Sequence, residues 1–142
     1  MKILVINGHP DKESYCQAIF QTIVETIDSN RHELQVISLN EEDFDPVLRY
    51  GYRKRMEEDS FILRSQEWIQ WADHLIFVYP IWWSSMPSLM KGWIDRVFTP
   101  GIAYSANDQG SFIWNYLRGK QFKKLLKGKT ASIYATSMAP TW

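Results

Sequence analysis

The residues most suited to binding chemistry lie in the segment VYPIWWSSMPSLMKGWIDRVF, from Val78 to Phe98. An apolar run ends at Pro80, and two adjacent tryptophans, Trp82 and Trp83, follow it. A flat ligand lying on a strand end would contact such rings and the backbone amides around them. The alternative that stays open is that one or both tryptophans pack in the core or at a dimer contact.

A second candidate segment, NGHPDKES at residues 7–14, follows the first apolar run. Gly8 allows a close turn, and Ser14 can cap the helix expected next. The free N–H groups and the dipole of a helix N-terminus favour an anion at this place, with His9 and Ser14 as side-chain donors. The simpler alternative is that Ser14 only caps the helix and His9 only closes the turn.

Apolar periodicity predicts the elements that position these segments. Residues 3–7 form a short apolar run, and Tyr15, Ile19, Ile23 and Ile27 recur with helical spacing. Further on, the pattern predicts strands at 32–39, 74–80 and 130–137, a loop at 41–46 and a surface helix from about 53 to 71. Between the strands at 74–80 and 130–137, the pattern predicts a helix with Pro87 in its first turn. One face of this helix carries the apolar residues Leu89, Trp93, Ile94 and Val97.

Strands that alternate with helices predict an α/β fold with a parallel sheet. Ligands of such sheets bind beyond the carboxyl ends of the strands, close to the point where the strand order reverses. The segments NGHPDKES, YPIWWSSMP and ATSMAP all stand at such ends, so we expect them to converge on one crevice. The acidic segment LNEEDFDP, after the second strand, is expected to lie to one side.

Composition limits the classes of partner. The chain has 142 residues, enough for one domain, and its 16 basic and 16 acidic side chains cancel. No overall field therefore attracts nucleic acid or a membrane surface. The single cysteine, Cys16, excludes an intrachain disulfide and provides no metal spacing, which favours a cytoplasmic location. No apolar run approaches the length of a membrane span, so membrane insertion is not expected.

These segments, in this order, resemble the flavodoxin-like NAD(P)H:quinone oxidoreductase family, which includes ancillary subunits of glutathione-gated potassium efflux systems. The resemblance rests on GHPDKES, the long block from Tyr79 to Phe98, and GIAY at residues 101–104, and it extends over the chain. It implies a flavodoxin-like open parallel sheet with helices on both faces. It also implies hydride transfer from NAD(P)H through FMN or FAD to quinones or similar two-electron acceptors.

By this resemblance, residues 1–142 form a single flavin-binding domain. The flavin phosphate is expected at His9 and Ser14 and at the amides of Tyr15 and Cys16. The isoalloxazine edge is expected along the segment that comprises Pro80, Ile81, Trp82, Trp83 and Ser84. At the end of the last strand many relatives have two glycines, whereas this chain has Thr136, Ser137 and Met138, which we expect to contact the flavin. No catalytic side chain and no metal site are assigned.

The resemblance also leads us to expect that a fifth strand and a last helix are lacking, so that the domain is incomplete at its C-terminus. The resulting exposed sheet edge would invite pairing with another chain. Because enzymes of this type are commonly homodimers with the active site at the subunit boundary, a homodimer is expected. The helix around Trp93 and the segment GIAY could serve there, although core packing is an equal alternative for them.

Other classes of protein fit the sequence less well. A receiver domain needs clustered acids after the first strand, and INGHP has none. A dinucleotide-binding Rossmann domain would have GxGxxG, which is absent, and one-electron flavodoxin carriers are usually markedly acidic. The strongest rival is a flavin-free or shortened interaction protein, such as a regulatory subunit of a transporter. Bound flavin and nicotinamide oxidation would distinguish the two.

Overall fold

The computed structural model of the chain describes residues 1–105 and 123–138. The expected alternation of strands and helices is confirmed. In chain order the elements are β1 (Lys2–Asn7), α1 (Tyr15–Thr26), β2 (Glu33–Ser38), the 3-10 turn η1 (Leu39–Glu41), α2 (Ser60–Trp71), β3 (His74–Pro80), α3 (Ser88–Val97), β4 (Tyr104–Ser105), β5 (Lys123–Lys124) and β6 (Thr130–Thr136). Within the described residues, no helix has both the length and the apolar character needed to cross a membrane.

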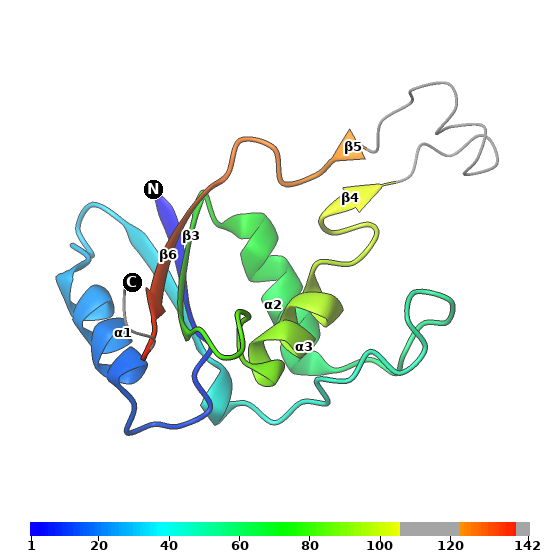
Figure 1. Ribbon diagram of the computed structural model, residues 1–142. Coiled ribbons are helices and arrows are strands. Elements are labelled where there is room, and N and C mark those ends of the chain that lie inside the picture. The colour runs from blue at the N-terminus through cyan, green and yellow to red at the C-terminus, as the bar shows by residue number, and fades with distance from the viewer. Residues whose placement is uncertain (106–122, 139–142) are drawn as a thin grey trace.

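Four strands form the main sheet in the order β2-β1-β3-β6, and every neighbouring pair is parallel. Figure 1 shows α1 on one face of this sheet and α2 and α3 on the other. The prediction of an open parallel sheet with helices on both faces is therefore confirmed. A short antiparallel pair, β4 and β5, stands apart from this sheet in the connection between α3 and β6.

The two faces of the sheet carry separate apolar cores. Alternate residues of β1 point to opposite sides, so that Leu4 and Ile6 pack towards α2 and α3 while Ile3 and Val5 pack towards α1. Trp93 of α3 is fully buried in the larger core, and its indole N–H donates to the Ser65 hydroxyl at 3.0 Å. Core packing, rather than a dimer contact, is therefore the explanation of Trp93.

The predicted surface helix begins later than expected. It starts at Ser60 rather than near Arg53, because the Asp59 carboxylate accepts the N–H groups of Phe61 and Ile62 at 3.0 and 3.2 Å and so caps the helix. The basic run at 53–55 would also oppose the positive end of a helix dipole. Similarly, Pro87 is the residue before α3 and not part of its first turn.

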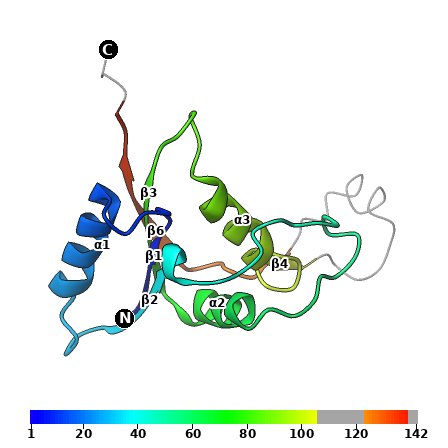
Figure 2. The same ribbon diagram turned by 90° about the horizontal axis from the view of Figure 1, so that it is seen from below.

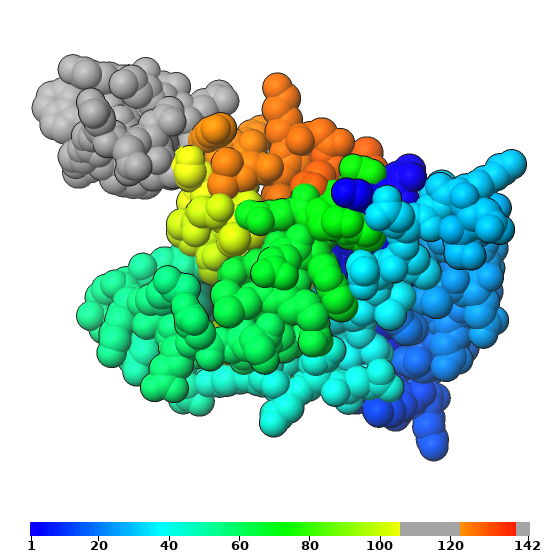
Figure 3. Space-filling view, turned by 180° about the vertical axis from the view of Figure 1, so that it is seen from behind, coloured from blue at the N-terminus to red at the C-terminus, as the bar shows by residue number. Residues whose placement is uncertain are grey.

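The irregular connection at residues 42–59 is attached to α3. Gly92 allows this close packing, since a Cβ atom there would lie 2.3 Å from the Pro46 carbonyl oxygen. One turn later, Arg96 Nη1 donates to the Asp45 carbonyl oxygen at 2.6 Å. In the space-filling view of Figure 3, this segment (teal) forms a lobe next to the green surface of α2. The position of the lobe therefore depends on two residues of α3.

Candidate functional site

The strand order reverses between β1 and β3. From β1, the chain places β2 on one side and β3 on the other. In parallel α/β sheets, ligands bind outside the carboxyl ends of the strands at such a point. The loops at 8–14 and 81–87 leave the sheet from these two strands, and Figure 2 views the molecule from this end. The structure thus brings the two main candidate segments to one edge.

Direct contacts join these two loops. The His9 ring meets the Trp82 ring edge-on, with centroids 5.4 Å apart and planes at 75°. At the base of the loops, the Gly8 N–H donates to the Val78 carbonyl oxygen at 2.8 Å. Glycine allows this approach, since a Cβ atom would lie 2.3 Å from the Met90 sulfur and 3.0 Å from the Met90 Cβ atom. The loop after β1 therefore lies tightly against β3 and the start of α3.

Thr136, at the end of β6, connects the third candidate segment to the other two. Its carbonyl oxygen accepts the Ile81 N–H at 2.7 Å, which connects it to the loop after β3. Its hydroxyl lies 3.2 Å from the Cys16 sulfur at the start of α1. The convergence of three strand-end segments, expected from the sequence, is therefore observed for their described residues. The last two residues of ATSMAP, Ala139 and Pro140, lie outside the described part of the chain.

The loop after β1 is arranged around the N-terminus of α1. The Ser14 hydroxyl accepts the Gln17 N–H at 3.1 Å and caps the helix. Among the described residues, the amides of Tyr15 and Cys16 have no hydrogen-bond acceptor, so that they stay available to a ligand. Because His9 Nδ1 accepts the Asp11 N–H at 3.0 Å, a neutral His9 carries its proton on Nε2 and can donate it outward. These donors suit an anion.

The loop after β3 contains a tight turn. The Trp82 and Ser85 backbones exchange N–H···O bonds of 2.8 and 3.0 Å, and Trp83 and Ser84 between them have φ values of 50° and 60°. Side chains other than glycine rarely adopt this left-handed conformation, which indicates local strain of the kind found at functional sites. In the described part of the chain, no group accepts the Trp83 or Ser84 N–H. The turn therefore presents two backbone donors.

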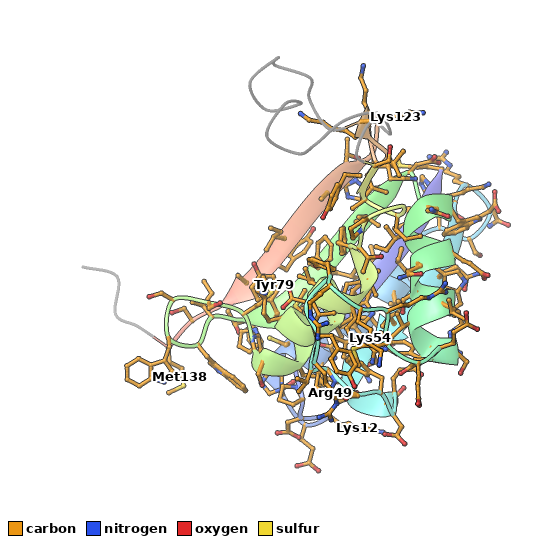
Figure 4. All side chains as sticks on the ribbon, turned by 90° about the vertical axis from the view of Figure 1, so that its right-hand side faces the viewer. Lys12, Arg49, Lys54, Tyr79, Lys123 and Met138 are labelled. Carbon is orange, nitrogen blue, oxygen red and sulfur yellow. The ribbon has the colours of Figure 1, made fainter. Side chains whose placement is uncertain are left out.

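The tryptophans of this turn do not pack in the core. The side chain of Trp82 is 46% exposed and that of Trp83 is entirely exposed, whereas Pro80 is buried at the end of β3. Met138 is also fully exposed, and Figure 4 shows it beside the loop after β3. Ser137 precedes it on the exposed end of the same segment. Core packing of the two tryptophans, one of the alternatives left open, is thus excluded.

Sequence reasoning missed one polar cluster at this edge. Asn7, Gln17 and Ser38 are linked by hydrogen bonds beneath the loop after β1. Asn7 is the only polar residue of the apolar run at 3–7, and its place at the end of a buried strand was the available signal.

Two further features lie outside the three candidate loops. A cavity of about 480 Å³ lies between the 48–59 segment, α2 and the end of α3. In the 42–59 connection, the hydrogen bond from the Val47 N–H lowers the pKa of Asp45, and the nearby Arg49 side chain lowers it further. Burial raises the pKa of Tyr52.

Within the described residues, no group of three or more His, Cys, Asp or Glu side chains could hold a metal ion. We place the site at the strand ends because the three candidate segments converge there, where the strand order reverses. None of the loops at 8–14, 81–87 and 136–138 lines the cavity.

Comparison with known protein families identifies one family for this chain. A family model described as a flavodoxin-like fold matches residues 1–142. The chain belongs to this flavodoxin-like family. The resemblance found in the sequence is thereby confirmed.

Curated relatives and solved structures extend the comparison. A ribosyldihydronicotinamide dehydrogenase-like protein of Penicillium crustosum is 30% identical over 96% of the chain and 57% of its own length. The ribosyldihydronicotinamide dehydrogenase [quinone] of Mus musculus is 28% identical over 94% of the chain and 66% of its own length. The crystal structure of Smu.1420 from Streptococcus mutans superposes with a TM-score of 0.77 at 33% identity, over 99% of the chain and 70% of its own length. The chain thus spans roughly 57–66% of these curated relatives.

Proposed function

We propose that the chain binds a flavin, FMN or FAD, at the carboxyl ends of β1, β3 and β6 and acts as an NAD(P)H:quinone oxidoreductase. The observation that carries this proposal is the contact of the two strand-end loops at the reversal of strand order, through His9 and Trp82. The names of the relatives from Penicillium crustosum and Mus musculus support the reaction class.

The donors at this edge fit the two polar parts of a flavin. The amides of Tyr15 and Cys16, the Ser14 hydroxyl and His9 Nε2 suit the phosphate, since they combine N–H donors with a helix N-terminus. The Trp83 and Ser84 amides suit the edge of a ring system that gains negative charge on reduction. Phosphate donors and ring donors come from neighbouring loops, as one extended ligand requires.

A bound flavin would accept a hydride from NAD(P)H and pass two electrons to a quinone-like acceptor. The chain itself would position the flavin ring system and stabilise the negative charge that the ring gains on reduction. The partly exposed Trp82 ring offers a flat wall, and the adjacent backbone donors hold the edge of the ring system. The site lies open to solvent in this chain, because Trp83 and Ser84 are exposed, so that a nicotinamide and an acceptor can occupy the same place in turn.

Steady-state kinetics of the flavin-loaded protein test this function. Initial rates are measured with NADH or NADPH at several fixed concentrations of a soluble quinone. We expect parallel double-reciprocal lines, because the nucleotide leaves before the acceptor binds. Converging lines would overturn the proposal that the nucleotide and the acceptor occupy the same place in turn. A flavin-loaded protein that oxidises neither NADH nor NADPH would overturn the proposed enzymatic function. In that case the rival function, an interaction or regulatory subunit, would take its place.

Three finer points belong to the same proposal. Residues 1–142 act as one flavin-binding domain, the chain works in the cytoplasm, and two copies form a homodimer. The exposed edge strand β6, whose Ile133 and Tyr134 side chains are 61% and 47% exposed, supports association with another chain.

A further inference from the structure

We propose that Asn7 is the positioning residue of the phosphate loop: it anchors a series of hydrogen bonds that leaves the remaining amides of the loop free for the flavin phosphate. This inference rests on the proposed flavin site. Asn7 is the last residue of β1 and is fully buried, although its side chain is polar. A buried amide group needs partners, and those of Asn7 are all at the candidate site.

The Asn7 side chain joins three segments. Its Oδ1 accepts the His9 N–H at 3.1 Å, and its Nδ2 donates to Gln17 Oε1 at 2.6 Å and to the Ser38 hydroxyl at 3.3 Å. The orientation of the amide is determined, because a backbone N–H can only donate and so must face Oδ1. Asn7 therefore connects the loop after β1 to the first turn of α1 and to the end of β2.

From Asn7 the hydrogen bonds continue along the loop in steps of two residues. Asn7 accepts the N–H of His9, His9 Nδ1 accepts that of Asp11 at 3.0 Å, and Asp11 accepts that of Glu13 at 3.0 Å. Side chains that accept backbone N–H groups two residues later stabilise turns. Of the three accepting side chains, Asp11 is exposed, His9 is half-buried and Asn7 is fully buried. Asn7 is therefore the fixed starting point of this series.

The series divides the amides of the loop into two groups. The N–H groups of His9, Asp11 and Glu13 are used inside the loop. By contrast, the N–H groups of residues 12, 14, 15 and 16 have no acceptor among the described residues. Loss of Asn7 would release the first turn and disorder the second group, which is the group that suits a phosphate. Asn7 thus acts on the phosphate through the loop and not by contact.

Comparison of FMN with riboflavin, which lacks the phosphate, tests this role. Dissociation constants are measured by fluorescence quenching for the wild type, Asn7→Ala and Ser38→Ala. Losing one buried hydrogen-bonded anchor should weaken FMN binding about tenfold. Riboflavin binding should stay within about twofold, because the ring is held elsewhere. Ser38→Ala, which keeps the bond to His9, should change the FMN-to-riboflavin ratio by less than about threefold.

Each outcome decides something. A wild type that binds neither FMN nor FAD overturns the proposed flavin site itself. A wild type that binds FMN, with an unchanged ratio in folded Asn7→Ala, overturns only the role of Asn7. If circular dichroism shows that Asn7→Ala does not fold, Asp11→Ala replaces it, since Asp11 is exposed and holds a later step of the series. A selective loss of FMN affinity in Asp11→Ala supports the inference, and an unchanged ratio overturns it.

Discussion

Ser14 caps α1, and the same hydroxyl is a proposed donor to the flavin phosphate. Its oxygen accepts the Gln17 N–H and so caps α1, while its own proton remains available to a ligand. Such residues explain why the sequence indicated the place of the site. A serine before an apolar helix and a histidine after a glycine are visible in NGHPDKES. The tautomer of His9 was not visible, since it depends on the turn that brings the Asp11 N–H to Nδ1.

We predict that Ser14→Ala lowers both stability and flavin affinity. Loss of the cap should reduce the free energy of unfolding by about 1 kcal/mol. Loss of a donor to a charged group should weaken FMN binding by about tenfold. Urea unfolding and FMN titration measure the two effects. The control is Ser60→Ala on α2, which is exposed and belongs to none of the three candidate segments; equal losses of FMN affinity in both variants would contradict the assignment.

The loop after β3 shows a limit of sequence reasoning at the scale of single elements. Two tryptophans after a strand suggested a flat wall, and their exposure agrees with it. The left-handed φ values of Trp83 and Ser84 could not be expected, because turns of this type usually contain Gly or Asn. Boundary errors arose elsewhere, as at α2, where the cap at Asp59 outweighed the charged pattern before it.

The strain in this turn should be measurable. A left-handed conformation costs an ordinary residue about 1–2 kcal/mol, and Ser84→Gly removes this cost while the turn keeps its shape. The gain in stability is partly offset, because glycine has a larger entropy in the unfolded chain. We expect an increase of up to about 1 kcal/mol in the free energy of unfolding. Ser85→Gly, at a neighbouring residue without positive φ, should lower stability by about 0.5–1 kcal/mol. Equal changes in the two variants would show that the turn is unstrained.

Helix α3 positions the 42–59 connection, and Gly92 allows the backbone at Pro46 to lie close to the helix. Gly92→Ala should lower the free energy of unfolding by about 1–2 kcal/mol, since a backbone carbonyl oxygen lies 2.3 Å from the added methyl group. In an open helix position the same change would instead stabilise by nearly 1 kcal/mol. Thermal unfolding, with the exposed Ser88→Ala on the same helix as the control, distinguishes the two signs. A higher midpoint for Gly92→Ala would contradict this packing.

For the whole molecule, the sequence predicted the class of fold well because its strands are short apolar runs between helical patterns. Parallel pairing and helices on both faces follow from that alternation. The strand order itself does not follow from the pattern and was available only through the family resemblance. The polar cluster at Asn7 was missed for a related reason, since its partners Gln17 and Ser38 lie 10 and 31 residues away in the sequence.

The edge strand β6 leads to a prediction about association. Ile133 and Tyr134 are neighbours and therefore point to opposite faces, yet both are exposed, so the described part of the chain leaves both faces open at this point of β6. We expect concentration-dependent association in sedimentation velocity, reduced by Ile133→Lys. Val36→Lys, on the opposite edge strand β2, is the control and should leave association unchanged. A wild type that stays monomeric at all concentrations would contradict the expectation.

The most direct test of the flavin site is the absorbance spectrum of the purified chain after incubation with FMN or FAD and desalting. We expect the protein to retain flavin, with bands near roughly 375 and 450 nm. We also expect Ser14→Ala to retain less flavin than the Ser60→Ala control. A folded wild-type chain that remains colourless with both flavins would contradict the proposal that the ends of β1, β3 and β6 form a flavin site.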